Sequence, residues 1–304
     1  MMDSISAALS AVQTYLPELE CRQDEQMKNH TSFKIGGPVR VMFFPKSADE
    51  IASLYKLLLE HEVLPFIMGN GTNLLASDEP MDMAIINMLG LCKIRRTGEV
   101  EITADAGVML SKLALFASEL ELSGLEFAHG IPGSLGGAVN MNAGAYGGEM
   151  KDVVIATTVI CPKMGCFEIS GAEHDFAYRH SRFSDGKEIA LSTVLRLVHG
   201  EGQSIKARMD ELCAKRRSSQ PLDMPSAGST FKRPKDGYAG TMIEQAGLKG
   251  YMSGGAQVSE KHAGFIINKG GATFLDIMRV IEHVKEVVFK QYGVRLELEV
   301  KVIS

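Results

Sequence analysis

A glycine-rich stretch between residues 124 and 150 carries the strongest chemical signal in this sequence. Seven glycines lie between positions 130 and 148, and small apolar residues are interleaved with them throughout. Glycine reaches positive φ at little cost and lets the backbone approach a ligand closely. Turns built in this way point several N–H groups into one concavity, which suits a pyrophosphate. A solvated linker would carry Ser, Lys and Glu instead, so the stretch predicts a packed loop that binds a large phosphate-bearing ligand.

A second phosphate-type loop, Gly69–Leu74, follows the short apolar strand expected at 64–68. It lacks the third glycine of a dinucleotide-binding fingerprint, because that position is Leu74, and no G-x-x-x-x-G-K-[ST] motif occurs anywhere in the chain. Taken alone the loop is a weak signal, which an ordinary turn would explain equally well. Together the two loops favour a nucleotide-containing cofactor.

The composition is that of a globular protein with more than one core. The chain has 304 residues, enough for two or three domains, and a net charge of −5 gives no general reason to bind nucleic acid. There is no run of 18 apolar residues and the N-terminus lacks the features of a signal peptide, so we expect a cytoplasmic protein without a membrane span. The five cysteines are scattered, which predicts free thiols and no metal site.

Helices and strands that could position the two loops are expected along the whole chain. Period-3.6 apolar stripes, with capping boxes at Ser47–Glu50 and Thr273–Asp276, predict helices at 4–16, 47–61, 110–120, 204–217, 240–246 and 274–292. Alternating or short apolar runs predict strands at 39–43, 64–68, 83–87, 99–104, 153–161, 166–170, 189–198, 263–267 and 294–302. Pro162–Gly165 reads as a hairpin turn, and Gly200–Gly202 as a domain boundary.

Four separated motifs resemble the UDP-N-acetylenolpyruvoylglucosamine reductase family, MurB. They are the glycine-rich run 130–147, the run 29–38 (Asn-His-Thr-Ser-Phe-Lys-Ile-Gly-Gly-Pro), Tyr178-Arg-x-Ser-x-Phe183, and Ala227-Gly-Ser-Thr-Phe-Lys232. Shorter matches at 247–250, 262–268 and Glu299-Val300 extend the resemblance over about residues 28–303. The short interval between Ser181 and Ser226 resembles the shorter, second type of the family. Asn70, Thr72 and Arg233 depart from the usual family residues.

The resemblance implies a fold and a reaction. The fold is α+β: a two-lobed FAD-binding domain of the PCMH/vanillyl-alcohol-oxidase type, with lobes at 1–85 and 86–203, and an α+β substrate-binding domain at 204–304. The reaction is the NADPH-dependent, FAD-mediated reduction of the enolpyruvyl ether of UDP-N-acetylglucosamine to UDP-N-acetylmuramate, for peptidoglycan synthesis in the cell wall. The expected partner is this small-molecule substrate, with neither nucleic acid nor a membrane.

The resemblance also implies three catalytic residues. Arg179 would stabilise the negative charge that develops on the substrate carboxylate, because arginine stays charged and grips a carboxylate bidentately. Ser229 would donate a proton to the second carbon, although a serine in such a segment more often caps a turn. Glu299 lies in the terminal Glu-Val motif and would assist. Periodicity alone cannot separate Glu299 from Glu297, because both lie on one polar face of the expected strand.

Binding residues follow from the same motifs. His129 could suggest covalent flavin attachment, but the resemblance is to a non-covalent reductase, so non-covalent FAD is expected. The basic residues 215–217 and Lys232 would bind a diphosphate or the NADPH 2′-phosphate, or else form a solvated helix end. The expected FAD ligands are Gly69, Asn70, Gly71, Thr72, Asn73, Leu74, Gly130, Ile131, Pro132, Gly133, Ser134, Gly136, Gly137, Asn140, Asn142, Ala143 and Gly144, and the expected substrate ligands are Tyr146, Arg216, Gln220 and Lys232.

Two other functions stay open on the sequence. One is a different FAD-dependent oxidase of the same superfamily, acting on a small alcohol or hydroxy acid; it would use oxygen and would not need Ser229. The other is a non-catalytic flavoprotein that binds UDP-sugars, which should lack an intact set of Arg179, Ser229 and Glu299. All three residues are present.

Overall fold

The chain divides into two compact units. The computed structural model describes residues 3–304. The first unit contains the residues up to 23, 40–70 and 82–214, and the second contains 24–39, 71–81 and 215–304. The expected lobes 1–85 and 86–203 do not coincide with these units, and the expected boundary after residue 203 lies in the first turn of helix α5 (Gly202–Ser219). Each unit therefore combines segments that are far apart in the sequence.

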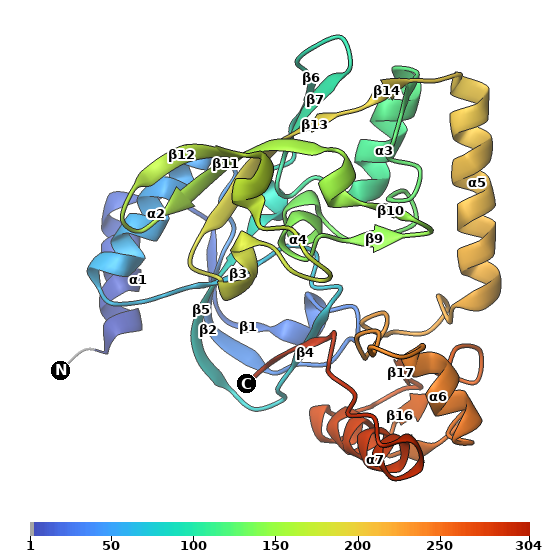
Figure 1. The fold of residues 1–304 in the computed structure, drawn as a ribbon. Helices are drawn as coiled ribbons and strands as arrows, with labels where there is room; N and C mark the ends of the chain where they lie inside the picture. The colour runs from blue at the N-terminus through green and yellow to red at the C-terminus, as the bar shows by residue number, and fades with distance from the viewer. Residues whose placement is uncertain (1–2) are drawn as a thin grey trace. The chain divides into compact units, whose positions relative to one another are not determined.

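The largest sheet lies in the first unit and is antiparallel throughout. Its five strands have the order β12-β11-β13-β7-β6 (Figure 1). The hairpin at Pro162–Gly165 is confirmed, and Gly165 has a φ of 71°, a left-handed conformation that glycine adopts without strain. The strands are β6 (Ile94–Arg96), β7 (Glu101–Asp105), β11 (Val154–Cys161), β12 (Gly165–Ser170) and β13 (Ile189–Arg196).

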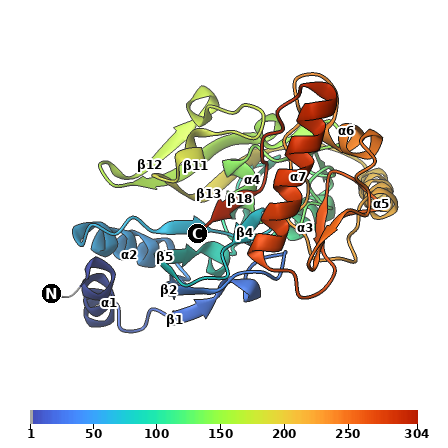
Figure 2. The same cartoon turned by 90° about the horizontal axis from the view of Figure 1, so that it is seen from below.

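A second sheet has the strand order β1-β2-β5-β3, with β3 and β5 parallel. Helices α1 and α2 lie side by side in both views of the fold (Figures 1 and 2). Helix α2 begins where the sequence predicts, because the Ser47 hydroxyl accepts a hydrogen bond from the Glu50 amide. The elements are α1 (Ser4–Tyr15), β1 (Cys21–Gln26), β2 (Pro38–Phe43), α2 (Ala48–Glu60), β3 (Phe66–Met68) and β5 (Met81–Asn87).

The glycine-rich stretch is more regular than the sequence predicts. It contains a short helix, α4 (Leu135–Asn140), and a small hairpin of β9 (Gly144–Ala145) and β10 (Gly148–Glu149), where we expected only a loop. Leu135, Ala138 and Val139 are buried in the same hydrophobic core as helix α3 (Leu110–Glu119). The interleaved small apolar residues therefore hold the stretch inside the first unit. Two further strands, β8 (Leu122–Ser123) and β14 (Val198–His199), pair nearby.

The second unit has its own hydrophobic core, built around helix α7 (Phe274–Tyr292). Both halves of the predicted capping box are present, and Gly293 ends the helix with a φ of 70°. A three-stranded antiparallel sheet, β15-β16-β17, packs against α7. The remaining elements are helix α6 (Ala239–Gln245) and strands β15 (Met252–Ser253), β16 (Ala256–Val258) and β17 (Ile266–Asn268).

The C-terminal segment corrects one prediction. The strand expected at 294–302 pairs only as β18 (Lys301–Ile303), which lies parallel to β4 (Leu74–Ala76), and upstream of it only Leu298 forms an isolated bridge, with Phe231. Residues 294–300 keep an alternating burial pattern without a continuous ladder. The β18–β4 pairing draws residues 71–81 into the second unit, and this long-range contact was not predictable from local pattern.

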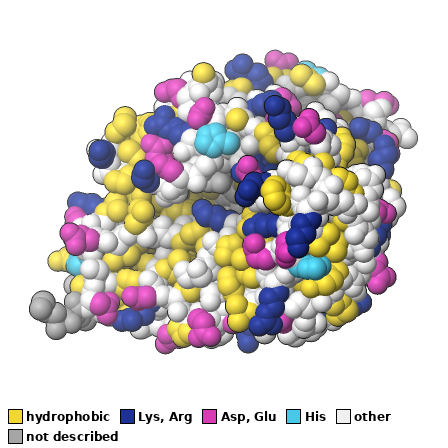
Figure 3. Space-filling view, turned by 60° about the horizontal axis from the view of Figure 1, so that its bottom comes forward, with side chains coloured by type: hydrophobic (Ala, Val, Ile, Leu, Met, Phe, Trp, Pro, Cys, Tyr) yellow, Lys and Arg dark blue, Asp and Glu magenta, His cyan; other side chains and the backbone are white. Residues whose placement is uncertain are grey.

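Several other features bear on function. All five cysteines are free thiols. Among residues 3–304, no helix is long and apolar enough to cross a membrane, and no three His, Cys, Asp or Glu side chains group in a way that could hold a metal ion. Acidic and basic side chains are interspersed on the face drawn in Figure 3.

Candidate active site and cofactor loops

Within the first unit the two glycine loops are joined. The Asn70 side-chain amide donates a 3.2 Å hydrogen bond to the Pro132 carbonyl. A Cβ added at Gly69 would lie 2.1 Å from the Ser134 hydroxyl, closer than real side chains approach. Gly69 is therefore required by its close packing against the second loop. The sequence placed these two loops in one site, and the structure brings their residues into direct contact.

Ser134 provides a structural test for a phosphate-bearing cofactor. Its hydroxyl is buried and has no hydrogen-bond partner among residues 3–304, although a buried polar atom without a partner costs stability. The neighbouring Gly137 faces open space, because a Cβ there would meet only the Ser134 hydroxyl, at 3.6 Å. A hydroxyl donor beside an uncrowded backbone fits the pyrophosphate of FAD.

Other residues expected to contact FAD have roles within the protein. A Cβ at Gly136 would lie 2.8 Å from that of Ala106, and a Cβ at Gly144 would lie 2.7 Å from the Glu149 side chain. These two glycines allow tight internal packing, so internal packing by itself requires glycine at both positions. Asn142 is 1% exposed, and both polar atoms of its amide bond other protein groups.

Asn140 connects the cofactor loop to the Tyr-Arg-x-Ser-x-Phe motif. Its side-chain amide donates to the Phe183 carbonyl at 2.8 Å, and its carbonyl accepts from the Ser181 hydroxyl at 2.8 Å. The Ser181 side chain thus binds the main chain of the glycine loop, and the Phe183 main-chain carbonyl binds the Asn140 side chain. Gly130, Ile131, Gly133 and Ala143 lie in the same packed stretch, and Ile131 and Ala143 pack against its core.

Arg179 lies at the tip of a tight turn. The amides and carbonyls of Ala177 and His180 bond one another at 3.1 and 3.2 Å, so Tyr178 and Arg179 are the two central residues. Arg179 has a φ of 54°, a left-handed conformation that is uncommon for a residue other than glycine and is often found at functional sites. The Arg179 guanidinium lies 5.1 Å from the centre of the Tyr178 ring.

Ser229 and Glu299 belong to neighbouring segments of the second unit. Between them, Thr230 donates its amide to the Gly264 carbonyl and accepts the Glu299 amide, each at 2.9 Å. The half-buried Ser229 hydroxyl makes no hydrogen bond to another residue within 3–304, so it does not cap a turn. Gly228 has a φ of 77° with open space around it, so glycine is needed there for its conformation.

Glu299 and Glu297 differ in burial and in their contacts, a difference that periodicity could not reveal. Glu297 is exposed and lies 3.4 Å from the Lys232 ammonium group, whereas Glu299 is half-buried. The Glu299 carbonyl accepts a hydrogen bond from the Asn73 side chain, in the Gly69–Leu74 loop. Gly71, Thr72, Asn73 and Leu74 also belong to the second unit, and Leu74 begins β4.

The expected substrate ligands differ in exposure. Tyr146 is partly exposed and left-handed, with a φ of 54°. Arg216 is half-buried near the end of α5, while Lys215 and Arg217 are exposed, so the basic cluster is not uniformly solvated. Gln220 is half-buried, and its main-chain N–H donates a hydrogen bond to the Arg216 main-chain carbonyl. Lys232 is paired with Glu297 and would have to exchange this partner to bind a phosphate.

His129 lies just before the cofactor loop. Its Nδ1 is 3.2 Å from the Cys213 sulfur, and both residues are in the first unit. The imidazole therefore has a protein partner, which agrees with its expected role as a hydrogen-bonding residue.

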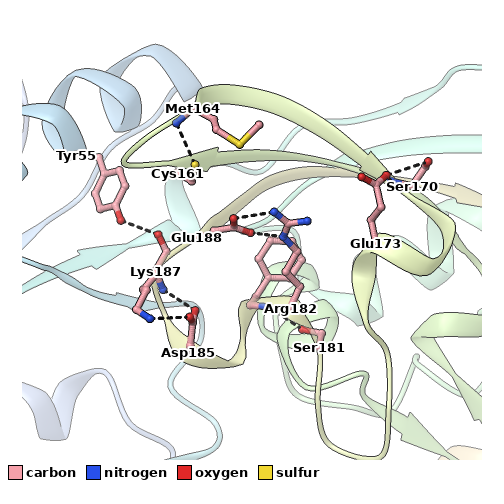
Figure 4. Close-up of polar contacts among 11 residues, drawn as sticks. Tyr55, Cys161, Met164, Ser170, Glu173, Ser181, Arg182, Asp185, Lys187 and Glu188 are labelled. Carbon is pink, nitrogen blue, oxygen red and sulfur yellow. Dashed lines mark hydrogen bonds and ion pairs between the residues drawn. The ribbon is translucent and has the colours of Figure 1, made fainter.

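The segment after the Arg179 turn is anchored to the rest of the first unit (Figure 4). Arg182 binds the Glu188 carboxylate through two nitrogens, and Tyr55 donates to the Lys187 carbonyl at 2.9 Å. Burial raises the pKa of Tyr55 to about 12, so this donor stays protonated. A cavity of about 540 Å³ beside Tyr55 has mainly apolar walls and contains no residue of the family motifs.

Sequence reasoning gave no role to Glu149, although it lies in the glycine-rich motif. Its carboxylate accepts the Asn142 side-chain amide at 2.9 Å and pairs with the Lys151 ammonium at 2.8 Å. The bond from Lys151, with smaller contributions from Asn142 and Arg179, lowers the pKa of Glu149 below its ordinary value. The signal that could have identified it was a lone carboxylate among glycines.

Comparisons with known proteins agree with both units. A family model described as FAD binding domain matches residues 39–168, and one described as the C-terminal domain of UDP-N-acetylenolpyruvoylglucosamine reductase matches residues 220–303. The reductase of that name from Caldanaerobacter subterraneus subsp. tengcongensis is 46% identical over 304 residues, covering 100% of this chain and 98% of the relative. The one from Thermotoga maritima is 47% identical over 280 residues, covering 91% and 97%. The crystal structure of the Thermus caldophilus reductase has a TM-score of 0.80 at 31% identity and covers 94% and 99%.

Proposed function

The chain belongs to the UDP-N-acetylenolpyruvoylglucosamine reductase family, and we propose how its own residues serve that family's reaction. It is an FAD-dependent oxidoreductase that reduces UDP-N-acetylenolpyruvoylglucosamine in peptidoglycan synthesis. NADPH is the reductant. The match of residues 220–303 to the family's C-terminal domain favours this reaction over an oxidase of small alcohols and over a non-catalytic sugar-binding protein.

The first unit supplies groups that fit FAD. Ser134 would donate its unpartnered hydroxyl to a phosphate oxygen, with the open backbone at Gly137 beside it, while Asn70 holds the two loops together. When bound, FAD supplies the hydride for the enolpyruvyl double bond. The proposed attachment is non-covalent, which the pairing of His129 with Cys213 supports.

Arg179 is proposed to stabilise the substrate carboxylate as negative charge develops on it. A guanidinium offers fixed paired donors and does not titrate. Its turn is closed by two backbone hydrogen bonds, which fix the main chain that carries the side chain. Donors held in place before charge develops are those that accelerate a reaction most.

Ser229 is proposed to donate the proton to the second carbon, assisted by Glu299. The single observation that carries this assignment is the Ser229 hydroxyl itself, which is half-buried and bonded to no other residue within 3–304. A serine retained only as a turn cap would use this hydroxyl on the backbone. The backbone bond from Glu299 to Thr230 keeps the two proposed residues on neighbouring segments.

One experiment tests the function as a whole. The FAD-loaded protein is reduced anaerobically with NADPH and then mixed with UDP-N-acetylenolpyruvoylglucosamine. Bleaching by NADPH followed by recovery of the oxidised flavin spectrum, with UDP-N-acetylmuramate as product, is expected. Reoxidation by oxygen but not by the enolpyruvyl sugar would favour the oxidase instead.

We also propose a set of substrate or NADPH ligands, which are Arg216, Gln220, Lys232 and Tyr146. A cytoplasmic location is proposed for the protein.

A further inference from the structure

The turn that presents Arg179 is closed by two backbone hydrogen bonds between Ala177 and His180, but it holds Arg179 in a strained conformation. Arg179 has a φ of 54° although it carries a full side chain, and that conformation is unfavourable for residues other than glycine. Strained backbone of this kind persists only when surrounding groups fix it. The groups that contact this turn therefore decide where the guanidinium lies.

Asn142 is one of those groups. Its side-chain nitrogen donates to the Ala177 carbonyl, at the base of the turn, at 3.1 Å, and to Glu149 at 2.9 Å. Its side-chain oxygen accepts the Lys151 amide at 2.9 Å. Asn142 is 1% exposed, so these protein groups are its surroundings. The amide connects the Arg179 turn to the hairpin of β9 and β10, which lies near α4 in Figure 1.

Glu149, together with the Ala177 carbonyl and the Lys151 main-chain amide, fixes the direction of that amide. A carboxylate accepts hydrogen bonds and cannot donate one when ionised, so it selects the orientation in which the Asn142 nitrogen faces Glu149. The Lys151 ammonium, 2.8 Å away, and the charge on Arg179 both favour the ionised carboxylate. Glu149 thus acts on the Arg179 turn through the side chain of Asn142.

We propose that Glu149 is a positioning residue for Arg179: its carboxylate orients Asn142, which holds the Arg179 turn. This inference rests on the role proposed for Arg179 above. A residue that acts in this way contributes only while Arg179 is present.

The test is a double-mutant cycle on the FAD-loaded enzyme, with the rate of flavin reoxidation by the enolpyruvyl sugar as the readout. Glu149→Gln keeps an acceptor for Asn142 but removes the charge, and it should slow reoxidation roughly 10-fold, because small displacements of a catalytic group have effects up to about 100-fold. Glu149→Ala should slow it further. Both should retain FAD and be reduced by NADPH at the normal rate.

The decisive comparison is made in the Arg179→Ala background. There, Glu149→Gln should have no further effect, since a residue that acts through Arg179 cannot act without it. Glu101→Gln is the matched control, because Glu101 also pairs with an arginine, Arg196, in the same unit, and it should leave reoxidation unchanged.

The outcomes separate this inference from the proposed function. If Arg179→Ala does not slow reoxidation, the role of Arg179 fails and the inference fails with it. If Arg179→Ala slows reoxidation but the Glu149 effect is undiminished in that background, only the inference is overturned. If Glu149→Gln loses FAD or unfolds, Glu149→Asp takes its place in the cycle; an effect on reoxidation that persists in the Arg179→Ala background, or no effect at all, would then overturn the inference.

Discussion

The side-chain amide of Asn73 donates a 2.9 Å hydrogen bond to the main-chain carbonyl of Glu299, 226 positions further along the chain. Next to this bond, β18 runs parallel to β4, and the Lys301 amide donates to the Asn73 carbonyl. Residues 71–74 of the loop expected to bind FAD and the segment expected to carry an acid therefore lie together in the second unit. A substitution in either segment should therefore alter the structure or the stability of the other.

Asn73→Ala should lower the stability of the protein even without cofactor. It removes the donor for the Glu299 carbonyl, and the loss of one such bond costs about 1 kcal/mol. Urea unfolding of the apoprotein measures this change. If Asn73 only bound FAD, the substitution would destabilise the FAD-loaded form and leave the apoprotein unchanged.

Gly137→Val should abolish FAD retention while the apoprotein still folds. The position faces open space, and exchanging glycine for valine in a helix changes intrinsic helix stability by less than about 1 kcal/mol. Gly136→Ala is the contrasting variant, because its Cβ would lie 2.8 Å from that of Ala106, so it should lower the thermal midpoint of the apoprotein. Flavin absorbance after gel filtration and thermal unfolding distinguish the effects of the two substitutions.

Flavin that remains attached after denaturation would contradict the proposed non-covalent binding.

Ser229→Ala should separate the two half-reactions. Reduction of FAD by NADPH precedes the use of the acid, so its rate should be nearly unchanged. Reoxidation by the enolpyruvyl sugar should slow by ~10²–10⁴-fold, the usual contribution of a general acid. Rapid-mixing absorbance of the flavin resolves both steps. Equal slowing of both would mean that Ser229 shapes the site, and if neither slows, Glu299 becomes the first candidate for the acid.

Arg216→Gln should raise a KM more than it lowers kcat, as expected when binding is weakened equally in the ground and transition states. Arg216 is half-buried at the end of α5, whereas Arg217 is exposed. Arg217→Gln is therefore the matched control and should change little. Steady-state kinetics with each substrate varied in turn identifies the affected ligand. An unchanged KM for both substrates would leave Arg216 with a structural role.

The free energy of unfolding should fall in mild acid because His174 is buried in the folded protein. It is fully buried between the Thr157 hydroxyl and the Gly171 carbonyl, and burial lowers the pKa of this imidazole below its ordinary value of 6.5. As the pH falls below 6.5, the unfolded chain takes up a proton that the folded protein does not. The stability present above pH 6.5 is therefore lost progressively as the pH falls toward the folded-state pKa.

Urea unfolding at pH 7.5 and 5.5 measures this effect. His174→Gln should narrow the difference in unfolding free energy between the two pH values, while His199→Gln, at a side chain that is 61% exposed, should not. Burial also lowers the pKa of His262, so part of the pH dependence should remain in the His174 variant. An unchanged difference in His174→Gln would exclude His174 as its source.

The sequence alone determined the features that depend on neighbouring residues. Thr273 and Asp276 cap α7 because both atoms of the box lie within one helical turn, and Gly165 closes the β11–β12 hairpin because the turn needs a left-handed residue. The family, the FAD requirement and the reaction also followed from motifs, since ligand contacts impose specific residues at fixed spacing.

Only the tertiary structure decided which residues of those motifs face open space and which pack against the protein. The glycine pattern does not distinguish Gly137, which faces open space, from Gly136, which packs on Ala106, because both need a small residue for different reasons. Period-two alternation places Glu297 and Glu299 alike, and their environments differ only because Lys232 and Thr230 approach from elsewhere in the chain. The burial of Asn142 and the pairing of β18 with β4 are long-range contacts, whose partners no local pattern specifies.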